Sequence, residues 1–168
     1  MYVICDNIRS LYNLGSIFRT ADALGVKKIY LCGISGTPKQ SGLTKVSLGA
    51  EKSVKWEYKK SAISVVNQLK KKGVKIVALE LAKNSVDIKK FQPQFPLALI
   101  LGNEVDGVAK NLLKRADAII HIPMQGQKES LNVSVAFGLA GYIIKTQEHK
   151  NTPVVEPSLL QGKVKIRK

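Results

Sequence analysis

Residues 97–107 of the chain read LALILGNEVDG, and this stretch decides the fold class. A continuous apolar run of this kind is typical of a strand that is buried on both faces, as in a parallel sheet. The run leads directly into a glycine, a carboxylate and a second glycine. Because ligands bind outside the carboxyl ends of strands in open α/β sheets, the same stretch predicts one wall of a binding site.

The rest of the chain repeats this alternation of apolar strands and amphipathic helices. Further strands are expected at 2–5, 28–32, 54–58, 74–81 and 118–122, and helices at about 17–24, 43–49, 61–72, 105–115 and 131–146. Residues 6–14 read as a polar turn, and the glycine- and proline-rich residues 33–42 read as a loop. Such alternation predicts an α/β fold in which a parallel sheet is flanked by helices.

The composition points to a partner with many negative charges. The chain has 168 residues, which suits one domain, and a formal net charge of +15. An excess of this size favours nucleic acid ahead of an acidic membrane surface. The alternative, a lysine-rich surface that only keeps the protein soluble, needs fewer charges.

Several classes of protein are not indicated by the sequence. No apolar run reaches the roughly 18 residues of a membrane span, and no signal peptide is evident, so we expect a cytoplasmic protein with no membrane partner. Cys5 and Cys32 lie in apolar runs and read as buried thiols. The two histidines, His121 and His149, lack metal-ligand spacing, so we expect no metal.

The last twenty residues differ in character from the rest, with two prolines and a basic end. We therefore expect a single domain over residues 1–147 and a basic tail over residues 148–168. The sequence leaves open whether this tail is mobile, packs on the domain or contacts RNA.

Residues 13–20, NLGSIFRT, stand at an expected junction between a strand and a helix. Asparagine and glycine suit a turn, and the start of a helix offers free N–H groups to an anion. Arg19 lies one to two turns into this helix. Taken alone, it also reads as an ordinary surface arginine.

Residues 122–136, IPMQGQKESLNVSVA, form a third motif at a strand end, a polar loop and a helix start. Ser130 is the expected N-cap. Asn132 and Ser134 are weak helix formers in the first turns, and packing alone does not explain them. In the stretch at 97–107, which is the second of the three motifs, Glu104 and Asp106 could simply complement a helix dipole. The sequence contains neither a GxGxxG fingerprint nor a P-loop, so the usual dinucleotide and nucleoside-triphosphate sites are not indicated.

Together the three motifs resemble the SpoU (TrmH-type) family of the SPOUT class of RNA methyltransferases. The shared patterns are N-x-G-x-x-x-R-T, L-G-N-E-x-x-G and I-P-M-x-G-x-x-x-S-L-N-V-S-V-A, and the resemblance covers about residues 2–146. It implies methyl transfer from S-adenosyl-L-methionine to a ribose 2′-hydroxyl of tRNA or rRNA. It also implies a SPOUT-type α/β fold with a deep C-terminal trefoil knot, and a homodimer with the active site near the subunit interface.

The resemblance assigns catalytic roles to Arg19, Asn13, Glu104, Ser130 and Asn132. Asn13 would orient Arg19 or the ribose, and Glu104 would hold the arginine or asparagine. Ser130 and Asn132 would position the nucleotide and the donor. In similar enzymes the arginine is proposed as the general base, although arginine is effectively always protonated. Two interpretations stay open: Arg19 takes the proton in a tuned pocket, or it stays charged, grips a phosphate and stabilises the alkoxide.

The resemblance also assigns binding residues. The donor would be held, largely through backbone groups, by Leu79, Leu101, Gly102, Ile122, Met124, Gly126 and Leu131. Many relatives carry an RNA-binding domain before the catalytic one, and we expect none here because the first motif begins at residue 13. The RNA would then be held by the catalytic domain and a partner subunit, with Arg9, Lys39, Lys45 and Lys52 as candidates.

Two alternatives compete with the interpretation as a methyltransferase. The first is a non-catalytic RNA-binding protein with the same fold, which would be expected to lack Arg19, Glu104 or Asn132. The second is a doubly wound nucleotide- or flavin-binding protein, which predicts a phosphate-binding glycine loop after the first strand. The chain keeps the three residues and shows no such loop.

Overall fold

The computed structural model describes residues 1–150, which contain one seven-stranded sheet. Its strands are β1 (Tyr2–Asp6), β2 (Lys28–Cys32), β3 (Trp56–Lys59), β4 (Lys75–Leu79), β5 (Val86–Asp87), β6 (Leu97–Leu101) and β7 (Ala118–His121). The order is β3-β2-β1-β6-β4-β7-β5, and every neighbouring pair is parallel. The predicted parallel sheet is therefore confirmed. The expected tail lies almost entirely outside the described residues.

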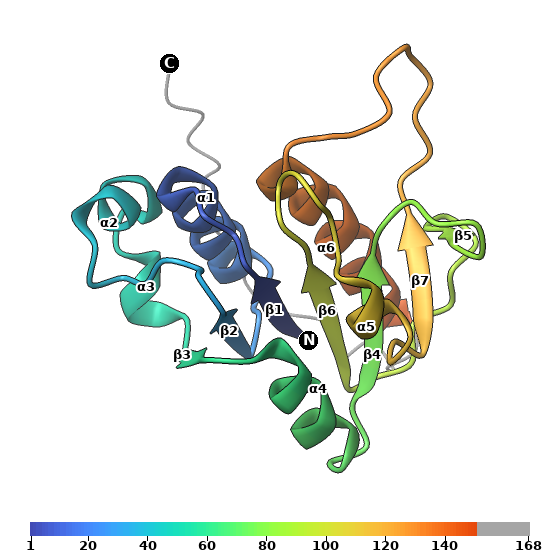
Figure 1. Ribbon diagram of the computed structural model, residues 1–168, viewed down its shortest axis with the longest axis horizontal. Helices are drawn as coiled ribbons and strands as arrows, with labels where there is room; N and C mark the ends of the chain where they lie inside the picture. Colours follow the sequence, from blue (N-terminus) through green and yellow to red (C-terminus); the bar gives the residue numbers. More distant parts are fainter. Residues whose placement is uncertain (151–168) are drawn as a thin grey trace.

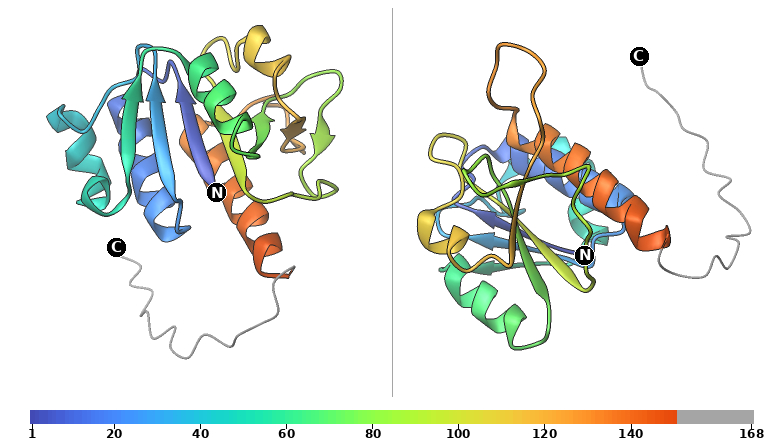
Figure 2. Two further views of the ribbon diagram at one scale, coloured as in Figure 1. Left: turned by 90° about the horizontal axis from the view of Figure 1, so that it is seen from below. Right: turned by 90° about the vertical axis from the view of Figure 1, so that its right-hand side faces the viewer.

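Helices cover both faces of the sheet (Figure 2). They are α1 (Leu11–Ala23), α2 (Ser41–Ser47), α3 (Ala50–Ser53), α4 (Ala62–Lys70), α5 (Lys110–Leu113) and α6 (Val133–Lys150). One core contains Phe18 of α1 and Phe137 of α6, and the other contains Val66 of α4 and Leu112 of α5. Cys5 and Cys32 are fully buried free thiols, as predicted. Within residues 1–150, no helix is long and apolar enough to cross a membrane.

Strand β6 lies at the centre of the sheet, between β1 and β4, and all five of its residues are buried. A strand with neighbours on both sides and helices on both faces must be apolar throughout, which explains the run that the sequence shows. The strands share one direction, so the loops that follow β4, β6 and β7 gather at one edge (Figure 1).

The start of α1 differs from the prediction, because residues 11–14 belong to the helix and not to a turn. The side chain of Ser10 accepts a hydrogen bond from the backbone N–H of Asn13 at 3.2 Å, so Ser10 caps the helix. The N-terminal motif therefore lies within a helix, and Asn13 and Arg19 both belong to that helix, α1.

The helix expected over residues 105–115 is also wrong, since α5 comprises only Lys110–Leu113. Residues 103–107 form a tight loop instead. The backbone groups of Asn103 and Gly107 exchange two hydrogen bonds of 3.0 Å, and Gly107 has a φ of 67°, which a helix does not adopt. These contacts hold residues 103–107 in a closed loop, although the local sequence pattern favours a helix.

The C-terminal helix begins at Val133, so Ser130 does not cap it as predicted. The Asn132 side-chain oxygen accepts hydrogen bonds from the backbone N–H of Ser134 at 2.9 Å and from its hydroxyl at 2.7 Å. Asn132 is thus the N-cap, and this explains a residue that packing could not. Strand β5 was not predicted, because two residues are too few to show a periodic pattern.

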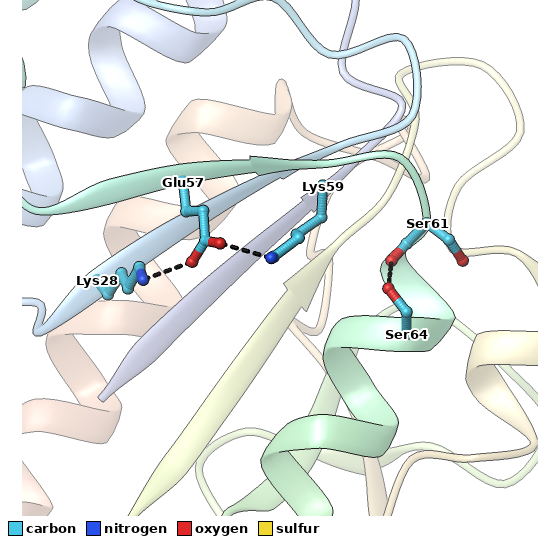
Figure 3. Close-up of polar contacts among 5 residues, drawn as sticks. All are labelled: Lys28, Glu57, Lys59, Ser61 and Ser64. Carbon is cyan, nitrogen blue, oxygen red and sulfur yellow. Dashed lines mark hydrogen bonds and ion pairs between the residues drawn. The ribbon is translucent and has the colours of Figure 1, made fainter.

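Glu57 of the edge strand β3 forms one ion pair across to β2 and one within β3. The Lys28 and Lys59 ammonium groups each lie 2.6 Å from a carboxylate oxygen of Glu57 (Figure 3). Hydrogen bonds from these two lysines lower the pKa of Glu57 from 4.5 to about 2. At the following helix start, the Ser64 hydroxyl donates to the backbone oxygen of Ser61, while the Ser61 side chain makes no capping bond.

The lowered pKa of Glu57 predicts a specific dependence of stability on pH. A carboxyl group whose pKa is lower in the folded state stabilises the fold above pH 4.5 and loses that contribution as the pH falls through about 2. Exposed pairs contribute about 0–1 kcal/mol, so the effect is small. Urea unfolding across this range should show a steeper loss in the wild type than in Glu57→Gln. Identical pH profiles would contradict the assignment.

Candidate active site

A cavity of about 1070 Å³ opens where β4, β6 and β7 end. It is lined by all seven residues expected to hold the donor: Leu79, Leu101, Gly102, Ile122, Met124, Gly126 and Leu131. Its size is that of a cofactor site, and apolar side chains mixed with a few polar groups are typical of such sites. The binding role of these residues remains a prediction.

Hydrogen bonds join the three sequence motifs at this cavity. The Asn13 side-chain Nδ2 donates to Glu104 Oε1 at 3.0 Å, and Asn13 Oδ1 accepts from Asn132 Nδ2, also at 3.0 Å. Asn132 Oδ1 is already occupied by Ser134. The two amide groups are therefore held in one orientation between the ionised carboxylate and the start of α6.

Glu104 also fixes the approach to α1. Its carboxylate accepts the backbone N–H groups of Arg9 at 3.3 Å and of Ser10 at 3.2 Å. These two N–H groups belong to the residues that directly precede α1, and their acceptor is a side chain of the protein itself. Partial burial raises the pKa of Glu104, but hydrogen bonds from Asn13 and from backbone N–H groups outweigh that effect and hold the pKa below its usual value. Glu104 is therefore ionised at neutral pH.

Glu80 is a site residue that the sequence reasoning missed. It follows β4, lines the cavity, and accepts the backbone N–H of Val108 at 2.7 Å through Oε2. That bond holds the end of the 103–107 loop, which carries Glu104. The strand expected over residues 74–81 contained Glu80, whereas β4 ends at Leu79. A carboxylate at the carboxyl end of a buried strand is the signal that could have identified this residue.

The lining of the cavity is acidic. Glu80, Glu104, Asp106 and Glu129 line it together with one ammonium group, that of Lys128. Such a lining suits a ligand with a net positive charge. Within residues 1–150, no three His, Cys, Asp or Glu side chains are arranged to hold a metal ion.

Arg19 does not join the hydrogen-bonded cluster within this chain. It is exposed and lines a separate cavity of about 430 Å³ together with Asp22 and residues 47–50 and 53. Six residues separate it from Asn13, which is about 9 Å along the helix axis and a different face of the helix. Ser130, by contrast, lines the main cavity.

The expected RNA-binding residues are exposed but scattered. The backbone of Arg9 is held by Glu104, whereas Lys39 precedes α2, Lys45 lies in α2 and Lys52 lies in α3. Three of these four residues therefore lie in or just before the helices α2 and α3, and none of the four lines the main cavity.

The sequence model of the SpoU rRNA Methylase family matches residues 1–142. The chain belongs to this family. The predicted family is therefore confirmed, and with it the class of enzyme, an RNA methyltransferase that uses S-adenosyl-L-methionine.

Individual relatives agree with this assignment. The chain is 33% identical over 166 residues to the tRNA (guanosine(18)-2′-O)-methyltransferase of Aquifex aeolicus, covering 98% of this chain and 77% of that protein. It resembles the AdoMet-bound rRNA methyltransferase of Sinorhizobium meliloti with 31% identity and a TM-score of 0.81, covering 86% of this chain and 55% of the other. The SpoU methyltransferase AviRb of Streptomyces viridochromogenes, solved in complex with AdoMet, gives 25% identity and a TM-score of 0.83, with coverages of 89% and 61%. The chain thus spans little more than half the length of the two solved relatives.

The glycine at the end of β6 predicts a stability effect with a matched control. A Cβ atom on Gly102 would lie 2.2 Å from the carbonyl carbon of Gly107 and 2.3 Å from the nitrogen of Val108, whereas one on Gly126 would meet nothing within 4 Å. Gly102→Ala should lower the free energy of unfolding by about 1–3 kcal/mol, the usual cost of overpacking. Gly126→Ala should leave it nearly unchanged in chemical denaturation. Equal stability of the two variants would contradict the close approach.

Proposed function

We propose that this chain transfers the methyl group of S-adenosyl-L-methionine to a ribose 2′-hydroxyl of tRNA or rRNA. The observation that carries the proposal is the hydrogen-bonded cluster of Asn13, Glu104 and Asn132 at an acidic, partly apolar cavity. Family membership and the relatives named above support the reaction class. The choice between tRNA and rRNA stays open.

The residues of the cavity fit this donor. S-adenosyl-L-methionine bears a sulfonium and an ammonium group against one carboxylate, so the acidic lining complements its net charge. Apolar Leu79, Ile122 and Leu131 suit the faces of an adenine ring. When bound, S-adenosyl-L-methionine supplies an already activated methyl group. The side chains that line the cavity give no reason to expect a metal.

The protein's task is alignment and removal of one proton. The ribose oxygen forms a bond to the methyl carbon while the carbon–sulfur bond breaks, and the hydroxyl proton leaves. Asn13 and Asn132, fixed by Glu104 and the start of α6, orient the nucleotide. Ser130 and Asn132 hold the methionine end of the donor. Arg19 either accepts the proton or stays charged beside the alkoxide and a phosphate, in which case the proton passes to water.

A second copy of the chain completes this arrangement. Val135, Leu139 and Tyr142 of α6 are 49%, 46% and 64% exposed, and their spacing places them on one face. Tyr12 of the neighbouring helix α1 is 69% exposed and shares its helical face with Arg19, seven residues later. A homodimer that buries this apolar face would carry Arg19 toward the partner's cavity, in agreement with its distance from the cluster in one protomer.

Three finer assignments belong to the same proposal. The C-terminal half of the sheet forms a deep trefoil knot, so that the loops after β4, β6 and β7 enclose the donor. The catalytic domain extends over residues 1–147 and is followed by a basic tail. The protein is cytoplasmic. Membership of the family supports the knot, and two buried free thiols agree with a reducing compartment.

Arg19→Ala should abolish methyl transfer to RNA while leaving donor affinity nearly unchanged, because Arg19 lies outside the donor cavity. Calorimetric titration with S-adenosyl-L-methionine and transfer of a labelled methyl group measure the two effects. Full transfer by the variant would remove Arg19 from the mechanism. Absence of donor binding by the wild type would favour the alternative of a non-catalytic RNA-binding protein.

Arg19→Lys separates the two roles of the arginine. Lysine has a pKa near 10.4, well below that of arginine, so a lysine that removes the proton should shift the rising limb of the pH–rate profile to lower pH. A lysine that only supplies charge should lower the rate without such a shift, because it loses the forked geometry.

Leu139→Glu should convert the protein from dimer to monomer, since a charge would be buried in the centre of the apolar face. Val86→Glu is the matched control, because Val86 is 42% exposed on β5, away from α6. Sedimentation velocity of both variants measures the effect. A dimer that survives in Leu139→Glu would contradict this interface.

A further inference from the structure

The opposite edge of the sheet, where the strands begin, carries an unbalanced row of positive charge. We call this row the basic rim. It consists of seven exposed residues: Lys27, Lys55, Lys71, Lys72, Lys75, Lys114 and Arg115. None of the seven belongs to the sites described above.

Strand register shows that these residues stand at one edge. Lys27 and Lys55 directly precede β2 and β3, which start level with each other because Ile29 pairs with Trp56. The backbone oxygen of Lys55 accepts the N–H of Ile29 at 2.9 Å. This end of the rim is therefore fixed by the sheet itself.

The other end of the rim lies beside β4 and β7. Lys71 and Lys72 follow α4, and Lys75 opens β4 opposite Leu97 of β6. Lys114 and Arg115 lie between α5 and β7, and the N–H of Asp117 donates to Ile76 O at 2.7 Å, which places the start of β7 next to that of β4. From β3 to β7 there are five inter-strand spacings, a row of about 24 Å.

Most acidic side chains near this edge are ion-paired with lysines outside the rim, so they offset little of its charge. Glu57 is paired with Lys28 and Lys59 (Figure 3), and Asp117 is paired with Lys70 at 2.8 Å. Asp22 keeps its charge, because its partner is the neutral Ser53 hydroxyl at 2.5 Å, but it is one carboxylate against the seven cations of the rim. Glu148 forms an ion pair with Lys145.

The donor cavity at the carboxyl edge has the opposite character, with four carboxylates and one lysine. A phosphate backbone is therefore repelled by the mouth of the cavity and attracted by the rim. Each strand is five residues or fewer, about 17 Å, so a folded RNA with one nucleotide at the carboxyl edge has arms long enough to reach the rim of the same or of a second protomer.

We propose that the basic rim is a second RNA-contact surface, which grips the phosphate backbone of the substrate at a distance from the methylated nucleotide. The proposal rests on the proposed function for its choice of RNA as the polyanion. Lysine predominates in the rim, and mobile ammonium groups suit a sequence-independent grip on phosphates. The sequence had pointed to Arg9, Lys39, Lys45 and Lys52 as RNA contacts and had left the basic tail over residues 148–168 open, so the rim was not among the predicted contacts.

The test compares two variants with the same change in charge. The rim variant replaces Lys55, Lys71, Lys72 and Lys75 by glutamine, and the control variant replaces Lys60, Lys83, Lys89 and Lys90, which are exposed elsewhere. Binding of bulk tRNA by the full chain is measured between about 50 and 200 mM salt. Each lost phosphate contact reduces the slope of log K against log salt by about 0.7–0.9, so the rim variant should lose up to about 3 units of slope and bind at least tenfold more weakly.

The control variant should keep a slope close to that of the wild type, and donor affinity should be unchanged in both variants. Equal slopes for the rim variant and the control variant would overturn the proposal. Labelled-methyl transfer is recorded in parallel. A wild type that binds tRNA through the rim but transfers no methyl group to unmodified tRNA or to unmodified rRNA would refute the proposed function and leave the rim standing.

Discussion

The Glu104 carboxylate is the contact on which the site depends. Glu104 stands on the loop that follows the central strand β6, and Gly102 allows this loop to fold close against the strand. The carboxylate accepts the backbone N–H groups directly before α1. In doing so it fixes Asn13, which fixes Asn132 at the start of α6. Three segments that are far apart in the sequence are thereby joined by one ionised group with a lowered pKa. Desolvation opposes this ionisation, and only the full set of donors offsets it.

Much of the fold follows from local pattern. The strands of the sheet centre are predictable because burial on both faces leaves no choice but apolar side chains, and their carboxyl ends identify the cavity. The helix starts are less predictable. Ser10 and Asn132 cap their helices through contacts that a periodic pattern does not contain, and the 103–107 loop is closed by Glu80, a residue 28 positions from Val108. Propensity alone assigns that loop to a helix.

The candidate site divides in the same way. The motif residues Asn13, Glu104 and Asn132 could be grouped from sequence because their spacing is that of a known family, and the structure joins them directly. Arg19 could be selected from the sequence, but its position relative to the cluster could not be predicted. Its side of the helix faces away from the cluster, and in the proposed dimer it would lie near the cavity of another copy. The basic rim could not be found from sequence, because its lysines come from four connections that only the sheet order brings to one edge.

The acidic lining of the donor cavity has a consequence for turnover. In the proposed reaction the sulfonium becomes a neutral thioether, so the spent donor loses the charge that four carboxylates attract. The cavity therefore holds fresh donor more strongly than the molecule left after transfer. In that reaction the protein's own electrostatics would favour exchange of the spent donor for fresh donor, and the by-product would inhibit the enzyme less than shape alone would dictate.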